Sequence, residues 1–346
     1  MKPLVLFLVA LLTACDGKLE RQPGDSDSIY ANDVVQAFKQ FQQAQNNQVQ
    51  ACLMSLEQLQ VSVTEFLSTP NSNNQKNAKR AWLQAHKAFL GSNLFSLVSQ
   101  NQLIFEIDAW PIQEGFLDSI PNYPHSGIIN DLTVAIDTES LQEQHGITDS
   151  REVSLGFHAL EFLIFSRKPE SFSLSGDNTK LRRRAAMKII LDLLISDIDL
   201  AFEEIGEASA DFLSELDDYD GKDLDGLKRL LGILNTRMQL LLSEANHIGD
   251  DNSGHSRISE SSWANLRDQI AVMNNLSGQK SELRKIFEKL DQKTTHDYDF
   301  TLNEAREILA GKKPSVDKST RIPLLFAALG HQLGDLQNIL ENRAYE

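Results

Sequence analysis

The chain has 346 residues, and its 33 Lys and Arg against 49 Asp and Glu give a formal net charge of −16. This acidic balance excludes a protein that binds nucleic acid through the phosphate backbone, because such binding needs a basic face. Hydrophobic residues make up 41% of the chain, which is enough for a sizeable core, whereas 18 Gly and 9 Pro are too few for a turn-rich β-sandwich or barrel. The two cysteines cannot form a disulfide scaffold.

Residues 1–14 are typical of a bacterial secretion signal. One positive charge precedes an apolar run over residues 4–12, which is too short to span a membrane. The run ends in Leu12-Thr13-Ala14-Cys15, which resembles the lipobox of bacterial lipoproteins. We therefore expect cleavage before Cys15, a lipid on its thiol, and a mature protein that is anchored to the cell envelope and faces the periplasm.

The predicted lipid makes the membrane a partner of the chain. Residues 15–28 are polar and rich in helix breakers, so they are expected to form a tether between the membrane and a folded domain. Asp16 follows the lipid-bearing cysteine, and in enterobacterial lipoproteins an Asp at this place resembles an inner-membrane retention signal. The remaining cysteine, Cys52, lies in an apolar helical stretch and is expected to be buried.

Beyond residue 30 the apolar residues recur at steps of three and four, which indicates amphipathic helices. The pattern is strongest over 177–206, where Asp177 is a suitable N-cap and the run Arg182–Arg184 is expected to form a solvated face. Helices are predicted over 31–68, 74–98, 152–168, 177–206, 223–247, 259–276, 279–292, 300–311 and 319–342. No stretch alternates as a sheet requires, so the predicted fold class is all-α.

Residues 106–150 interrupt this pattern. They contain Pro111, Pro121 and Pro124 with few periodic apolar positions, so we expect a long irregular connection with one short helix at 128–135. An insertion of this length without regular structure in a compact protein is usually functional or lies over a site.

Acidic residues crowd the segment 207–226, together with two glycines. A calcium-binding EF-hand loop needs acidic residues at its first and last positions, but alignment on Gly221 places leucines at both. The segment is therefore predicted to be a solvated linker near the boundary of two helical bundles. The expected bundles are residues 29–210 and residues 211–346.

The hexapeptide Gly156–Glu161 reads Gly-Phe-His-Ala-Leu-Glu, and the apolar run Phe162–Phe165 follows it. Residues three apart share one face of a helix, so His158 and Glu161 can present an imidazole and a carboxylate to one metal ion. A Glu in so apolar a stretch is expected to be buried, and a buried carboxylate must be paired or bind metal. The residues alone leave two interpretations open, a metal or catalytic site and a satisfied pair in the core.

This Gly-x-His-x-x-Glu motif with its apolar run resembles the signature of the imelysin-like family of bacterial envelope proteins, and the resemblance covers roughly residues 30–340. The sequence departs from the family pattern at His86, where Arg is expected, and at Ser92-Asn93, where an acidic residue is expected. The other segments that carry the resemblance are Ala81–His86, similar to a Trp-bearing early helix; Ile107–Pro111 with Gly115–Asp118, similar to an Asp-x-Trp-Pro stretch; and Arg237-Met238 with Ser256–Ser259, similar to Arg-Met and Ser-x-Phe-Ser elements.

The resemblance implies an all-helical fold of two bundle-like domains, with the His-x-x-Glu site near their junction, and a link to iron uptake in the periplasm. We expect His158 and Glu161 to bind a metal ion, the divalent or ferric iron of that process with zinc as the alternative, and we expect metal-uptake or other envelope proteins as partners. Asp108 and Asp118 are the candidate carboxylate partners of these ligands. The further candidate site residues are Gly156, Trp110, His86 and Ser259.

The founding name of the family comes from an insulin-cleaving peptidase activity. A zinc peptidase needs three protein ligands, an open water position and a carboxylate base. His-Glu-x-x-His is absent, and the inverted His-x-x-Glu-His would need a histidine where Phe162 stands. Metal binding therefore ranks first, a metallopeptidase second, and third a non-catalytic interaction module in which the pair of His158 and Glu161 locks a bundle junction.

One further spacing involves a histidine. Glu244-Ala245-Asn246-His247 has the Glu-x-x-His arrangement of di-iron carboxylate bundles, but in a single copy near a helix end, where polar helix-terminal residues are the expected interpretation. Surface or core roles are expected for the remaining histidines, His125, His145, His255, His296 and His331.

Overall fold

The computed structural model describes residues 26–98, 103–174, 177–217, 224–250, 254–311 and 314–343. The predicted signal, Cys15 and most of the predicted tether lie outside these residues. Within them the chain forms helices and, apart from one isolated bridge between Ile120 and Tyr123, no β-structure, which confirms the all-α prediction. No helix among the described residues is both long and apolar enough to cross a membrane.

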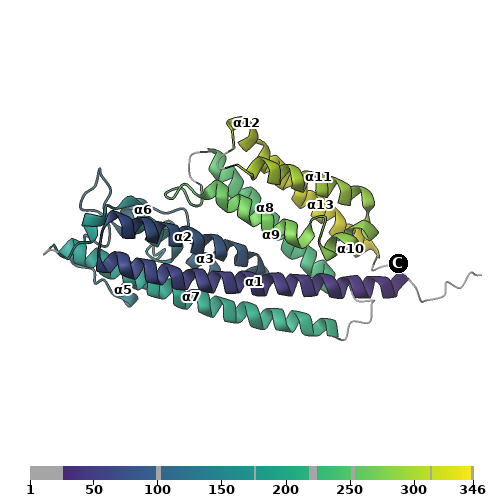
Figure 1. The fold of residues 1–346 in the computed structure, drawn as a ribbon, viewed down its shortest axis with the longest axis horizontal. Helices are drawn as coiled ribbons and strands as arrows, with labels where there is room; N and C mark the ends of the chain where they lie inside the picture. The colour runs from purple at the N-terminus through teal and green to yellow at the C-terminus, as the bar shows by residue number, and fades with distance from the viewer. Residues whose placement is uncertain are drawn as a thin grey trace, which may run out of the picture.

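Two long helices run the length of the first half. α1 (Ser26–Ser68) packs along α7 (Asn178–Asp217), and α2 (Ser72–Ser92) folds back along α1 (Figure 1). The reversal between α1 and α2 is set by Asn71, because its side-chain oxygen accepts the first free backbone N–H groups of α2 at 2.9 Å. The apolar positions of α1 that the sequence pattern identified are buried against these neighbours.

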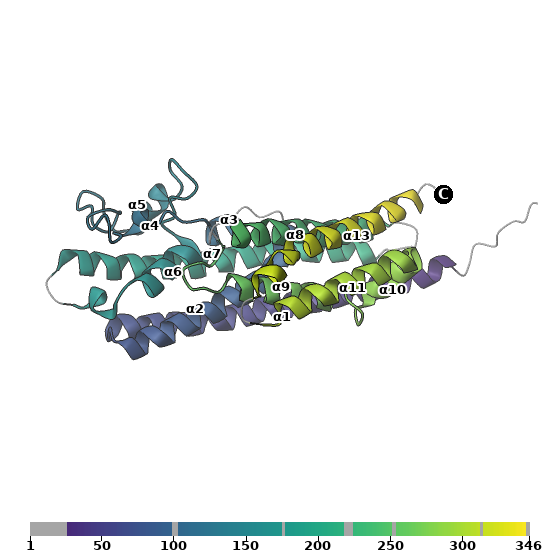
Figure 2. The same ribbon diagram turned by 90° about the horizontal axis from the view of Figure 1, so that it is seen from above.

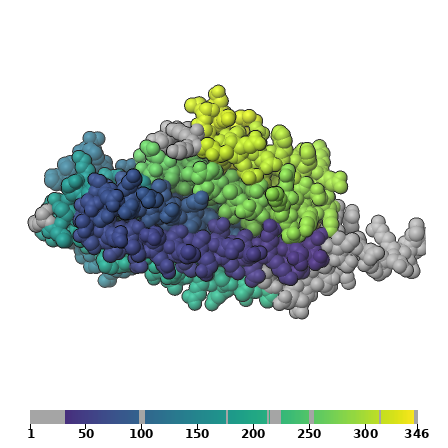
Figure 3. Space-filling model, in the orientation of Figure 1, coloured from purple at the N-terminus to yellow at the C-terminus, as the bar shows by residue number. Residues whose placement is uncertain are grey.

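The second half is a separate layer of helices on one flank of α1. α13 (Arg321–Arg343) packs against both α8 and α11, and α9 and α10 contact α1. In the space-filling view these green-to-yellow elements lie over one end of the purple α1, and the blue-to-teal first half lies at the other end (Figure 3). The bounds of the remaining helices are α8 Asp225–Asp250, α9 Ser262–Ser277, α10 Glu282–Leu290, α11 Gln292–Leu309 and α12 Val316–Ser319.

The irregular connection protrudes beside α7 at one end of the molecule (Figure 2). It contains only short helices, which are α3 (Leu103–Ile107), α4 (Glu114–Leu117) and α5 (Thr138–Gln144). The short helix predicted at 128–135 is wrong, because these residues form turns and the helix begins ten residues later, where Asp137 caps it by accepting the N–H of Ser140 at 2.9 Å.

An arginine explains why the segment 128–134 does not become helical. The guanidinium of Arg182 donates hydrogen bonds of 2.7–2.9 Å to four carbonyl oxygens of this segment. These carbonyls thus have a partner without forming a helix. The predicted solvated face at Arg182–Arg184 is also wrong, since Arg183 is buried and Arg184 donates to the carbonyls of Leu67 and Phe172.

The acidic segment 207–226 is helical in part. α7 continues to Asp217, well past the end predicted at 206, and α8 begins at Asp225. The two halves contact each other where α7 meets α8 and where α9 and α10 pack against α1.

Candidate metal centre

The motif helix α6 (Gly156–Ser166) begins at a glycine whose conformation and surroundings both exclude a side chain. Gly156 has a φ of +79°, and a Cβ at this position would lie 2.4 Å from the carbonyl oxygen of Ile107 and 2.8 Å from that of Glu106. The end of α3 therefore lies directly against the start of α6. This contact brings Asp108, the residue after α3, beside His158.

Three histidines and one aspartate converge at this junction. The Nε2 atoms of His86 in α2 and His158 in α6 lie 2.9 Å and 3.2 Å from Oδ1 of Asp108, and Nε2 of His255 lies 3.0 Å from its Oδ2. One ligand atom from each of the four residues lies within 4.8 Å of the others, and all four residues are buried. Ligand atoms about 2.0–2.2 Å from one ion have separations of this order.

The hydrogen bonding of this cluster is incomplete. Nε2 of His158 and both ring nitrogens of His255 are buried and have no hydrogen-bond partner of acceptable geometry. Buried polar atoms are nearly always paired. Unpartnered imidazole nitrogens that face one carboxylate are what a metal ion would satisfy, so the four residues fit a bound ion.

Glu161 lies behind the ring of His158. Its Oε2 is 2.7 Å from Nδ1 of His158, and its Oε1 accepts the backbone N–H of Ser259 at 2.7 Å. Both oxygens therefore have partners, and neither faces the point where the Nε2 atoms converge. Glu161 and Ser259 thus fix the orientation of a candidate ligand, as the carboxylates behind metal-bound histidines do.

His86 is held by aromatic and polar contacts. Its ring stacks on Trp82, with centroids 4.7 Å apart, and Nε1 of Trp82 donates to the carbonyl of Phe157 at 3.0 Å. On the other side of the ring, Oγ of Ser256 lies 3.4 Å from Nδ1 and accepts from the amide of Asn265 at 2.7 Å. The position where the resemblance leads one to expect Arg is therefore occupied by a fixed imidazole that belongs to the cluster.

The pKa values reflect the burial and the charges of the cluster. Burial lowers the pKa of His86 to about 4, with partial compensation from Asp108, so its ring is neutral at pH 7. Burial also opposes the charge of His158, but the contacts with Asp108 and Glu161 outweigh it and raise the pKa of His158 to about 10. Burial raises the pKa of Asp108, and the histidines around it hold that pKa well below its ordinary value. The metal-free cluster thus contains a proton that a cation bound at Nε2 would replace.

Trp110 covers the cluster from outside. Its half-buried ring packs edge-on against His255, with centroids 5.0 Å apart, and against the exposed His247 at 5.2 Å. Trp110 is therefore near the site, as predicted, in contact with a histidine rather than with the convergence point.

Asp118 does not join the cluster, contrary to the prediction. This fully buried carboxylate lies 2.5 Å from Nε of Arg183 and 3.1 Å from Nε of Arg167, and it accepts from the amide of Asn130 at 3.0 Å. Two guanidinium groups neutralise it, so it needs no metal ion. Its role is to attach the irregular connection to α7.

His255 is the cluster member that the sequence interpretation missed. It lies in the loop between α8 and α9 and not on a helix, so helical spacing gives no indication of its partners. The available signal is its place directly before the Ser256–Ser259 element that carries part of the family resemblance.

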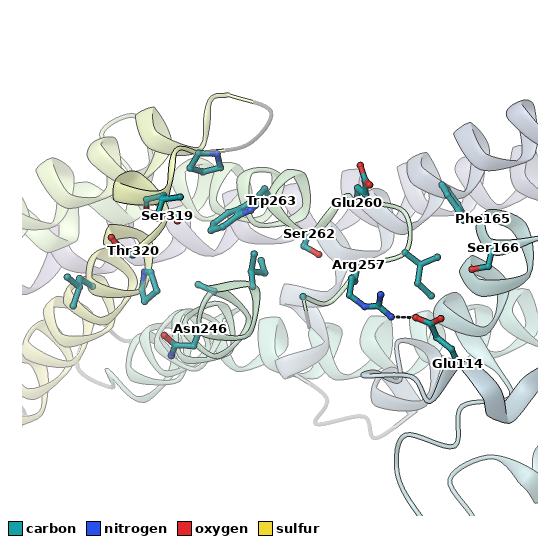
Figure 4. Close-up of a pocket in the computed structure, with 18 residues that line it drawn as sticks. Glu114, Phe165, Ser166, Asn246, Arg257, Glu260, Ser262, Trp263, Ser319 and Thr320 are labelled. Atoms are coloured by element: carbon teal, nitrogen blue, oxygen red, sulfur yellow. Dashed lines mark hydrogen bonds and ion pairs between the residues drawn. The ribbon is translucent and has the colours of Figure 1, made fainter. Parts of the chain in front are cut away.

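The loop of His255 also forms the wall of a large surface cleft. The cleft has a volume of about 1240 Å³ and extends between α6, this loop and the start of α13. In it the exposed Arg257 reaches from the loop to Glu114 in α4 and forms an ion pair (Figure 4). Gly254 and Arg257, on either side of His255 in this loop, both line the cleft.

Comparisons with known proteins give a family match and a similar solved structure. Residues 40–335 match the family model Peptidase_M75, described as imelysin. The crystal structure assigned as an iron-regulated protein A precursor from Parabacteroides distasonis ATCC 8503 has a TM-score of 0.60 with the chain at 14% identity, over 93% of this chain and 97% of that chain. At this identity the likeness shows the fold alone. A comparison with curated protein sequences finds no match.

Proposed function

The chain belongs to the imelysin family, and we propose that it binds one divalent transition-metal ion, iron in its physiological setting, for uptake into the cell. The ligands are His86, Asp108, His158 and His255. One observation carries the proposal: three imidazole Nε2 atoms from distant parts of the chain face a single buried carboxylate at 2.9–3.2 Å.

The donor set decides the class of ion. Three imidazoles and one carboxylate suit iron, zinc, copper or nickel, whereas calcium and magnesium prefer oxygen ligands. The choice of iron rests on the iron-uptake role that the family resemblance implies and on the name of the structural neighbour, which is an iron-regulated protein. Zinc is expected to bind more tightly than ferrous iron in vitro, as the general order of divalent affinities requires.

Metal binding is favoured over peptide cleavage because the carboxylate of Glu161 already has hydrogen-bond partners. A metallopeptidase needs a free carboxylate base beside an open coordination position. Both oxygens of Glu161 already have partners, and the rings of His86 and His158 are only 1% exposed. A peptide therefore finds no free base at Glu161 and no room beside these two ligands.

The location and the partner are part of the same proposal. The pattern that ends at Cys15 supports a lipid anchor that holds the chain at the envelope with its folded part in the periplasm, and the metal would pass to an uptake protein there. Incorporation of labelled palmitate that is lost in Cys15→Ser tests the anchor. A Cys15→Ser protein that still carries the label would refute it.

Equilibrium dialysis of the mature chain with Zn²⁺, and with Fe²⁺ under anaerobic conditions, tests the metal site. We expect one ion per chain, and a large loss of affinity in His158→Ala, His255→Ala and Asp108→Asn. His331→Ala is the matched control, because His331 is exposed and pairs with Asp335, away from the cluster. A wild-type chain that binds no ion, combined with a His158→Ala variant that is less stable, would leave the structural lock as the function of the pair.

A further inference from the structure

A second buried carboxylate lies on the far side of His255 from Asp108. Glu244 in α8 is 7% exposed and belongs to the Glu244–His247 segment, which has the Glu-x-x-His spacing of di-iron ligand pairs. The two side chains separate instead. His247 is exposed and packs against Trp110, whereas Glu244 points into the protein towards the ring of His255.

Two buried atoms without partners face each other at this point. Oε1 of Glu244 lies 3.6 Å from Nδ1 of His255, and neither atom has a hydrogen bond. One is an acceptor and the other is a ring nitrogen that can carry a proton. A shift of about 0.5 Å brings them to hydrogen-bond distance, which is a small adjustment for a ring on a loop.

The position of Glu244 is fixed from behind. Its Oε2 accepts from the amide of Gln269 in α9 at 3.2 Å, and the oxygen of that amide accepts from the guanidinium of Arg237. Arg237 is buried and also approaches the carbonyl of Leu90 in α2, the helix that carries His86, at 3.5 Å. Glu244, Gln269 and Arg237 all lie on helices, so the side chain of Glu244 is fixed. The ring of His255 lies on a loop, and we expect it to make the adjustment.

The chemistry of a metal-bound imidazole gives this arrangement a purpose. A neutral imidazole has one N–H, and a metal ion at Nε2 requires that proton to be on Nδ1. His86 and His158 are held by their helices, whereas His255 lies in a loop, and its Nδ1 faces Glu244. We propose that Glu244 is the positioning residue of His255, accepting its Nδ1–H when Nε2 binds the metal. This inference rests on the proposed metal site.

The test compares Glu244→Ala and Glu244→Gln with a matched control, Asp299→Asn. Asp299 is also a buried carboxylate of the second half, 6% exposed, with one oxygen bound to Arg284 at 2.7 Å and the other without a partner. It therefore controls for the loss of a half-satisfied buried acid. The measurements are the affinity for Zn²⁺ and the visible spectrum of the Co²⁺-loaded chain, which reports the ligand number and geometry.

We expect Glu244→Ala to lose about 10–100-fold in Zn²⁺ affinity and its Co²⁺ spectrum to approach that of His255→Ala. Glu244→Gln keeps an oxygen acceptor and should fall between Glu244→Ala and wild type, and Asp299→Asn should match wild type in both measurements. If His255→Ala loses binding but Glu244→Ala keeps the wild-type affinity and spectrum, the inference is overturned. If the alanine variant does not fold, the same result in Glu244→Gln overturns it. If wild type and His255→Ala bind equally, the proposed metal site itself fails.

Discussion

Replacing Gly156 by Ala tests whether the contact between α3 and α6 builds the metal site. An alanine at a φ of +79° costs about 1–2 kcal/mol for the left-handed backbone. Its Cβ would also lie 2.4 Å from the carbonyl oxygen of Ile107, and forcing an extra methyl group into packed surroundings costs about 1–3 kcal/mol. The sum is a loss of about 2–5 kcal/mol in the free energy of unfolding. The relief of this clash separates Asp108 from His158, so metal affinity should fall as well.

Denaturant titration of the metal-free chain measures the first effect, and Zn²⁺ titration of the folded variant measures the second. Gly206→Ala is the matched control, because Gly206 lies within α7 and a Cβ there meets no atom within 4 Å. A helical Gly-to-Ala change of this kind should stabilise the chain by about 0.5–1 kcal/mol and leave the affinity unchanged. A Gly156→Ala protein with wild-type stability and wild-type affinity would refute the role assigned to this contact.

Three further substitutions test contacts around the site. Asp118→Asn leaves two arginines without their carboxylate and should lower the free energy of unfolding at pH 7 by about 3–5 kcal/mol. Burial raises the pKa of Asp118, but the arginines bring it below its ordinary value. The stabilisation by Asp118 is therefore fully present above the unfolded pKa of about 3.9 and is lost as the pH falls through the folded pKa. Denaturant titrations from pH 7 to pH 3 measure this loss. Arg182→Ala removes the donor to four carbonyls and should expose residues 128–134 to limited proteolysis. Arg257→Ala breaks the exposed pair with Glu114, worth at most about 1 kcal/mol, and should speed metal release up to about fivefold in a chelator-capture experiment.

Each of these expectations has a defined contrary result. An Asp118→Asn chain that loses as much stability in acid as wild type would show that another group causes the acid sensitivity. Arg80→Ala removes an exposed arginine of α2 and should leave the proteolysis pattern unchanged, so equal cleavage in it and in Arg182→Ala would contradict the role of Arg182. Exchanging the charges of Arg257 and Glu114 should restore the slow release, and a double variant as fast as Arg257→Ala would exclude their pairing as the cause.

The sequence predicts the helices well because the burial of α1 and α2 follows from local periodicity, and that of α6 from its continuous apolar run. It predicts Gly156, His158 and Glu161 as a unit for the same reason, since the three lie within one helix start. The orientation of Glu161 cannot be predicted from local sequence, because the partner of its second oxygen, the N–H of Ser259, lies 98 residues further along the chain.

Long-range contacts explain the remaining differences. His255 has no local signature as a ligand, and it reaches Asp108 only because α8 and α9 hold its loop against the first half. Arg182 and Asp118 have side chains whose partners lie in the irregular connection, where no periodicity indicates which groups will be adjacent. Arg182 looks solvated in the sequence but donates its hydrogen bonds to backbone carbonyls. Asp118 looks like a metal ligand but is paired with arginines.

The balance of charges in the buried cluster gives an independent reason for a divalent ion. In the metal-free chain Asp108 and Glu161 each carry a negative charge and His158 carries one positive charge, because their mutual contacts lower the pKa of the two carboxyls and raise that of the imidazole. Two negative charges against one positive leave a net charge of −1 in a buried site, and uncompensated buried charge is costly. When a divalent ion replaces the proton of His158 and the imidazoles coordinate as neutral rings, two positive charges meet two negative ones. The proposed divalent ion therefore matches the charge of the residues that surround it.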